Sequence, residues 1–290
     1  MAVFKRSWRL TIELENKIKI FQELENADMS LKIDFSAKNS VKGYCEGNIT
    51  LCNLSRNDML YLANCATFGK NGITKQNKIT LECGYNGDLA IILAGNIQSV
   101  NADFGSVDNK IQLKIIGNLS QNSINKGKAI SINGNVDLKQ VCKELTTLQK
   151  IKLQYDESVK PTLLKGFTFL GTPLKLLENL RESFKDYVFY FSEDGQTLKV
   201  EMQGATQKRG VQKLSYKTGL IGTPTPTQFG ITATSLLNTA LKVGGWVKLE
   251  SQKVSGYNGD WYITEISHKG TNQGADWLSM LELRKEAVVL

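Results

Sequence analysis

The chain has 290 residues, of which 41% are apolar and 22% are charged, with only 4 prolines. This composition is ordinary for a soluble globular protein and excludes a chain dominated by disorder. At about 100 to 200 residues per domain, the length predicts about two domains with sizeable cores. The N-terminus lacks the apolar stretch of a secretory signal, and the longest apolar run, residues 89–94, is too short to span a bilayer. We therefore expect synthesis in the cytoplasm without membrane insertion.

The formal net charge of +8 would suit a polyanionic partner. Lys and Arg are scattered along the chain, however, and close basic clusters are no longer than pairs such as Lys208-Arg209. A protein that follows a phosphate backbone needs a basic stripe. We therefore favour a solvated basic surface. An oligonucleotide-binding β-barrel stays an alternative.

The five cysteines include four in the first third of the chain, and Cys142 stands alone. The four are Cys45, Cys52, Cys65 and Cys83, separated by seven, thirteen and eighteen residues. These spacings match no standard zinc module and include no CxxC motif, so buried thiols in a reducing compartment are favoured. A metal or iron–sulfur site formed by these four cysteines stays open, because folding brings distant strands together.

Apolar residues alternate with period two over much of the first 108 residues, which predicts strands. The alternating sets are Leu10, Ile12 and Leu14; Ile18 and Ile20; Leu31, Ile33 and Phe35; Ile49 and Leu51; and Ile79 and Leu81. Ser55 followed by Asp58 predicts the N-terminus of one short helix. Gly87 and Gly95 predict a tight turn and a close backbone approach. A β-module with one helix follows.

From residue 109 to 204 the pattern is mixed. It predicts a strand at 111–115, a helix at 136–148, a strand at 151–155, and a hairpin of strands 187–191 and 198–202. Thr172-Pro173 predicts an N-cap followed by proline in the first turn of an amphipathic helix. This region is expected to be an inserted α+β segment.

Residues 205–290 are expected to form a second β-module. Two prolines at 224 and 226 predict an extended loop over 222–227, and a helix is expected at 235–241. Strands are expected at 246–249, 260–266 and 276–283. Together these strands predict one side of a small barrel.

Two stretches of the chain resemble phage baseplate hub proteins. Residues 219–283 contain GTPTPTQFGITATSLLN, the step His268-Lys269-Gly270 and the pair Asp276-Trp277, and they look like the last barrel of that family. Residues 49–100, with ITLCNLSRNDMLYL and ITLECGYNGDLAIILAGNIQSV, resemble its first barrel. The middle of the chain matches by pattern only.

The resemblance implies an α+β, mostly β fold with two tail-tube-like β-barrel domains, residues 1–108 and 205–290, around an inserted α+β domain, residues 109–204. It implies a homotrimer presenting six similar barrels, which joins a tail tube to a central spike around a channel. The implied partners are a spike protein and tube, tube-initiator, tape-measure or baseplate wedge proteins. The genome would cross the channel without specific binding, and no cofactor is implied.

The resemblance also implies a location in the tail baseplate of the virion, after assembly in the host cytoplasm. The sequence ends at Leu290 without a hydrolase-like or β-helical extension. We therefore expect the spike to be a separate protein.

His268 is the only histidine. A lone histidine without a fixed Ser, Cys or carboxylate partner is more typical of a hydrogen-bonded turn residue than of a catalytic base, so we expect no enzyme activity. His268 and the tryptophans Trp246, Trp261 and Trp277 are candidates for subunit or partner contacts, with core packing as the alternative for the tryptophans.

Paired carboxylates support one further alternative, a tail-associated cell-wall hydrolase. The candidate pairs are Glu13 with Glu15, Glu23 with Glu25, and Asp186 with Glu193. Glycoside hydrolysis needs two carboxylates about 5 to 10 Å apart in a cleft. Charged residues that alternate on strands more often form a solvated face. We therefore favour a structural role.

Overall fold

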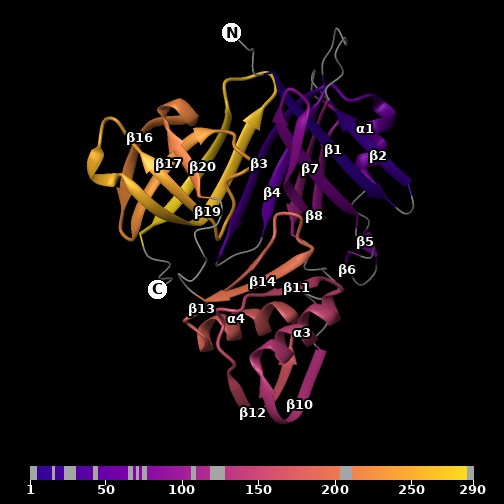
Figure 1. The fold of residues 1–290 in the computed structure, drawn as a ribbon. Coiled ribbons are helices and arrows are strands. Elements are labelled where there is room, and N and C mark those ends of the chain that lie inside the picture. Colours follow the sequence, from indigo (N-terminus) through magenta and orange to yellow (C-terminus); the bar gives the residue numbers. More distant parts are fainter. Residues whose placement is uncertain are drawn as a thin grey trace.

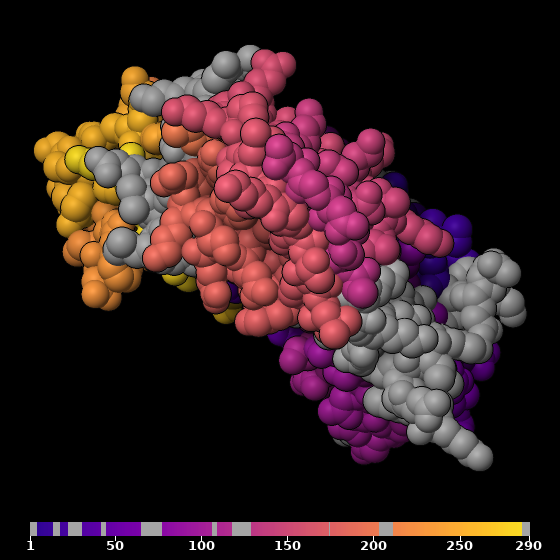
Figure 2. All heavy atoms as spheres, turned by 90° about the horizontal axis from the view of Figure 1, so that it is seen from below, coloured from indigo at the N-terminus to yellow at the C-terminus, as the bar shows by residue number. Residues whose placement is uncertain are grey.

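The computed structural model describes residues 5–14, 17–22, 31–41, 45–64, 68–69, 72–73, 77–105, 109–117, 128–202 and 211–285. The protein is mostly β, as the sequence predicted. Two β halves lie side by side, and an α+β segment lies below them (Figure 1). From below, that segment covers the middle of the molecule, between the gold C-terminal half and the indigo to purple N-terminal half (Figure 2).

Over its described residues, the N-terminal half contains seven strands of the main sheet, one helix and a separate pair of two-residue strands. Its elements are β1 (Arg6–Leu14), β2 (Lys17–Gln22), β3 (Lys32–Ser40), β4 (Glu46–Cys52), α1 (Arg56–Ala63), β5 (Phe68–Gly69), β6 (Gly72–Ile73), β7 (Lys78–Tyr85), β8 (Asp88–Asp103) and β9 (Lys110–Ile116). The predicted start of α1 is confirmed, because the Ser55 side chain accepts a hydrogen bond from the N–H of Asp58 and caps the helix. The predicted tight turn at Gly87 is also confirmed, because Asn86 and Gly87 have positive φ and connect β7 to β8.

The α+β segment packs two helices between a two-stranded ribbon and a three-stranded sheet (Figure 1). Its elements are β10 (Lys128–Asp137), α3 (Leu138–Gln149), β11 (Lys152–Tyr155), β12 (Leu163–Gly171), α4 (Pro173–Ser183), β13 (Tyr187–Phe191) and β14 (Thr197–Met202). The predicted cap of α4 is confirmed, because Thr172 Oγ1 accepts from the N–H of Lys175 and Pro173 occupies the first turn.

The C-terminal half consists of strands and two short 3-10 turns. Its elements are β15 (Gln212–Ser215), η1 (Tyr216–Thr218), β16 (Leu220–Thr227), β17 (Gly230–Leu236), β18 (Trp246–Glu250), η2 (Ser255–Tyr257), β19 (Gly259–Thr271) and β20 (Trp277–Arg284). The three strands predicted after residue 245 are confirmed.

One continuous sheet joins the two halves. Its strand order is β16-β17-β20-β19-β3-β4-β9-β8-β7-β1-β2, with β18 paired to β19 and β15 paired to β18. The join is the antiparallel pair β19–β3, in which residues 265 to 271 face residues 40 to 34. The halves are therefore hydrogen-bonded into one body.

The cores confirm that the halves are not independent. The N-terminal core includes Leu237 and Trp277 from the C-terminal half, and the C-terminal core includes Val41 from the N-terminal half. The C-terminal core also includes Val188 and Tyr190 of the α+β segment. A third core lies inside the α+β segment, between its sheet and its helices. Burial therefore couples all three parts.

Three sequence predictions are wrong in detail. The expected helix at 235–241 is absent, since residues 230–236 form β17 and residues 237–241 are irregular. Every second residue of β17, namely Ile231, Ala233 and Ser235, is buried, and this period of two is typical of a strand and not of a helix. The expected loop 222–227 is part of strand β16. This strand is the last of the main path, so prolines are tolerated on its outer side, where no ladder hydrogen bond needs a backbone N–H. The strand at 111–115, expected in the insertion, is β9, and it pairs with β4 and β8 in the main sheet.

Candidate functional site

The junction between the halves contains the only histidine. His268 lies in the interior of β19, opposite Ala37 of β3 and Ser279 of β20, so the expectation of a turn residue is wrong. Its Nδ1 lies 2.9 Å from Ser279 Oγ, and Ser279 Oγ accepts from the N–H of Asn238. Burial, with a smaller effect of Lys242, lowers the pKa of His268 to about 4. The imidazole is therefore neutral at neutral pH and inaccessible as a base.

The tryptophans expected at partner contacts lie mainly inside the chain. Trp261 and Trp277 are buried in the two β cores, as is His268 at the junction, so these three side chains offer almost no surface to a neighbouring subunit. Trp246 is half-buried and meets Tyr262 edge-on at a centroid distance of 5.7 Å. Of the four candidates, only Trp246 keeps an exposed part that a partner would reach, and its contact role stays a prediction.

The cysteines Cys45, Cys83 and Cys142 are buried, as the sequence favoured, whereas Cys52 is only half-buried. Desolvation raises the pKa of Cys45 and of Cys142 to about 12, and raises that of Cys83 well above the ordinary thiol range. Cys65 lies outside the described residues. Among the described residues no group of three or more His, Cys, Asp and Glu side chains is placed to hold a metal ion.

The paired-carboxylate hypothesis falls partly on residues that the structure does not describe. Glu15, Glu23 and Glu25 lie outside the described residues. Glu193 forms an ion pair with Lys242, with Oε2 and Nζ 3.3 Å apart. No described observation favours this chemistry over the structural role.

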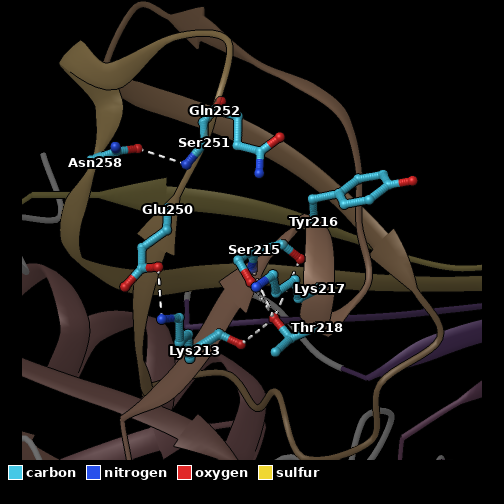
Figure 3. A pocket seen from close by; sticks show the side chains of 9 residues that line it. All are labelled: Lys213, Ser215, Tyr216, Lys217, Thr218, Glu250, Ser251, Gln252 and Asn258. Carbon is cyan, nitrogen blue, oxygen red and sulfur yellow. Dashed lines mark hydrogen bonds and ion pairs between the residues drawn. The ribbon is translucent and has the colours of Figure 1, made fainter.

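A polar groove of about 600 Å³ lies in the C-terminal half, between the end of β15 with η1 and the end of β18 (Figure 3). Its lining residues are Lys213, Ser215, Tyr216, Lys217, Thr218, Glu250, Ser251, Gln252 and Asn258. The sequence did not predict it, because β15 and β18 are far apart in the chain and no motif marks their parallel pairing.

Much of the groove's polar lining is bonded within the protein. Lys213 and Glu250 form an ion pair at 2.7 Å, Ser215 and Thr218 bond to each other, and the Asn258 side chain accepts from the N–H of Ser251. The Tyr216 ring is 76% exposed beside them and points away from the other sticks in Figure 3. This arrangement suits contact with a polar partner surface and holds no nucleophile–base pair among its lining residues.

A continuous row of directly paired residues crosses the eleven strands of the main path, from Ile18 on β2 to Ile221 on β16. The paired residues in order are Ile18, Glu13, Lys78, Asn96, Ile116, Glu46, Lys38, Ser267, Met280, Thr234 and Ile221. Both terminal isoleucines are exposed. The open ends of the sheet thus carry apolar side chains on the same face.

The described residues contain no helix that is long and apolar enough to cross a membrane.

Several solved structures share this architecture. The chain is similar to the 43 kDa tail protein of prophage MuSo2 from Shewanella oneidensis, with a TM-score of 0.66, 11% identity, and coverage of 98% of this chain and 99% of that one. It is also similar to a tail protein from Neisseria meningitidis MC58, with a TM-score of 0.65, 10% identity and 97% coverage of both chains.

A third similar structure is the Escherichia coli c3393 protein, a type VI secretion component described as similar to the T4 bacteriophage tail proteins gp27 and gp5. It has a TM-score of 0.63 and 10% identity, over 90% of this chain and 75% of that one. At these identities the likeness establishes the fold alone. A search of curated sequences finds no match.

The chain therefore has the fold of these tail and type VI secretion proteins. The model of the baseplate hub gp41 family matches residues 8–282. The chain belongs to this family, and it is a baseplate hub protein of a phage tail.

Proposed function

We propose that the protein forms a trimeric ring that joins the tail tube to a separate spike protein around a central channel, without enzymatic activity. The observation that carries this proposal is the β19–β3 pair, which makes two β halves one rigid body. Three such bodies in a ring would present six β halves. That number suits a junction between a sixfold tube and a threefold spike.

The open ends of the sheet support a closed ring. On β2 the side chains of Ile18 and Ile20 are 66% and 54% exposed, and β16 carries exposed Ile221 at the other end. Exposed apolar residues on a free edge are an aggregation hazard unless another chain covers them. A head-to-tail arrangement that closes after three copies would cover both ends.

The remaining partners follow from the same arrangement. The α+β segment, described over residues 128–202, extends away from the main sheet, where it can meet baseplate wedge or spike proteins. The β halves would meet the tube, tube-initiator or tape-measure proteins. We place assembly in the host cytoplasm, and the genome in the channel without specific contacts.

The test is native mass spectrometry with electron microscopy of the purified protein. We expect a trimer with threefold symmetry. The double variant Ile18→Glu/Ile20→Glu should reduce the trimer to monomers while the melting temperature of the monomer stays unchanged. The matched control is Leu163→Glu/Leu170→Glu, which places the same two charges on two exposed leucines of β12, far from the ends of the main sheet.

Three outcomes would contradict the proposal. A monomer that is absent from tail particles would remove the hub role. A double variant that stays trimeric would remove the β2 edge from the interface. Release of peptidoglycan fragments, or salt-dependent binding of single-stranded DNA, would favour the hydrolase or the oligonucleotide-binding alternative.

A further inference from the structure

The α+β segment docks on the C-terminal half through one face of its own sheet. Phe189, Phe191, Leu198 and Val200 point to the helices, whereas Val188 and Tyr190 belong to the C-terminal core. Val188 pairs with Glu201, so Glu201 shares the docking face. The sheet therefore lies between its own helices and the C-terminal half.

Tyr190 packs closely against the C-terminal half in this docking. A Cβ built on Gly244 would lie 2.2 Å from the Tyr190 hydroxyl oxygen, so the ring packs directly on the Gly244 backbone. Gly244 has φ +79, a left-handed conformation suited to glycine, and its N–H donates to the carbonyl of Ile263. The Lys242–Glu193 ion pair lies at the rim of the same interface.

A carboxyl group is enclosed in this interface without a cation bonded to it. Glu201 is 7% exposed, and its Oε1 accepts from the Tyr190 hydroxyl at 3.1 Å. Its Oε2 is buried and has no hydrogen-bond partner, and the buried hydroxyl of Tyr262 on β19 also has none. A desolvated carboxylate with one hydrogen bond is costly, whereas a carboxylic acid has a proton to donate.

We propose that Glu201 keeps its proton in the folded protein, and that this proton fastens the α+β segment to the C-terminal half. Protonation removes the charge from this enclosed carboxyl group, so the interface closes over a neutral group and not over a desolvated carboxylate. Loss of the proton to solvent leaves a buried carboxylate and weakens the docking. The relative position of the two parts thereby depends on pH.

The charges around Glu201 are consistent with this assignment. Burial raises the pKa of Glu201, the Tyr190 hydrogen bond and Lys199 oppose the rise, and Asp156 adds to it. Lys199 lies over the Tyr190 ring at 5.7 Å and forms no hydrogen bond with Glu201 among the described contacts. Burial raises the pKa values of Tyr190 and Tyr262, so both phenols stay neutral. Glu193, which also acts on Tyr190, is paired with Lys242.

The direction of the pH effect follows from the raised pKa. An unfolded or undocked glutamate loses its proton near pH 4.3, while the docked one keeps it to a higher pH. The docked state therefore loses stability as pH rises above 4.3, until the docked group also ionises. Each unit of separation between the two pKa values changes the docking equilibrium tenfold.

The test compares the full-length protein with Glu201→Gln, a neutral side chain of the same shape, between pH 5 and 8. The amides of β13 should lose protection against hydrogen exchange, corrected for intrinsic rates, as the pH of the wild type rises. The protection of the same amides should change less than about threefold over this pH range in Glu201→Gln. Glu178→Gln, on the exposed face of α4, is the matched control and should follow the wild type.

A direct measurement keeps the proposal falsifiable if the variant misfolds. Carboxyl ¹³C titration of wild-type Glu201 should give a midpoint above the value of about 4.3 of an exposed glutamate. An ordinary midpoint would overturn the proposal. Equal pH dependence in the wild type and a folded Glu201→Gln would do the same.

Discussion

The Trp277 ring of the C-terminal half meets the Phe35 ring of the N-terminal half edge to face, with centroids 5.2 Å apart and planes at 82°. Arg6 on β1 covers the same indole at 5.6 Å and donates hydrogen bonds to the carbonyls of Thr271 and Ala275. The two halves are thus held to each other by one aromatic pair and by Arg6, next to the β19–β3 ladder.

Replacing Trp277 with alanine should destabilise the whole protein. The side chain is fully buried, so truncation should cost about 3 to 5 kcal/mol in urea unfolding, and Trp277→Phe should cost less. Circular dichroism and fluorescence should report one shared transition. Trp246→Ala, at a half-buried site, is the control with a smaller loss. Two separate transitions would contradict a shared core.

His268 should make the protein sensitive to mild acid. Its pKa is about 4 in the folded protein and 6.5 when exposed, so the unfolded chain binds more protons between these values and stability falls as pH drops from 6.5 to about 4. The loss should be on the order of 3 kcal/mol. His268→Asn keeps a polar atom near the position of Nδ1 and cannot titrate. Unfolding free energies measured from pH 7 to 4 should fall more steeply for the wild type. Parallel slopes would show that His268 does not carry the effect.

Local signals in the sequence predicted much of the fold. Alternating apolar residues located most strands, and Ser55 and Thr172 marked the starts of α1 and α4, because capping and strand periodicity depend on neighbours within a few residues. The Asn86-Gly87 turn was found for the same reason. These features are short-range, so one sequence suffices.

Pairings between distant residues were not predictable in this way. The sequence did not predict that residues 265–271 pair with 34–40, because the register of strands that far apart is decided by shared burial. Nor did it separate core from contact tryptophans, since both environments favour large aromatic side chains. The groove around Tyr216 and the enclosed Glu201 arise from the same long-range packing.

Gly95 should tolerate no side chain. A Cβ there would lie 2.2 Å from the carbonyl oxygen of Ile116 on β9, a backbone atom that cannot rotate away. Gly95→Ala should therefore cost about 1 to 3 kcal/mol in chemical unfolding. Gly256→Ala is the matched control, since no atom lies within 4 Å of its built Cβ, and it should change stability by less than about 0.5 kcal/mol. Equal stability of the two variants would mean that β8 and β9 are farther apart at this point.

The buried thiols should be inert in the folded protein. Cys45, Cys83 and Cys142 are enclosed and their pKa values are raised, so thiolate is scarce even at pH 8. Iodoacetamide labelling followed by peptide mass spectrometry should leave these three unmodified in the native protein and modify them fully in urea. Half-buried Cys52 is the internal comparison and should react first among the four. Rapid native labelling of Cys83 would show that the N-terminal core opens. Protection of Cys45, Cys52 and Cys83 that a chelator removes would instead revive the four-cysteine metal site.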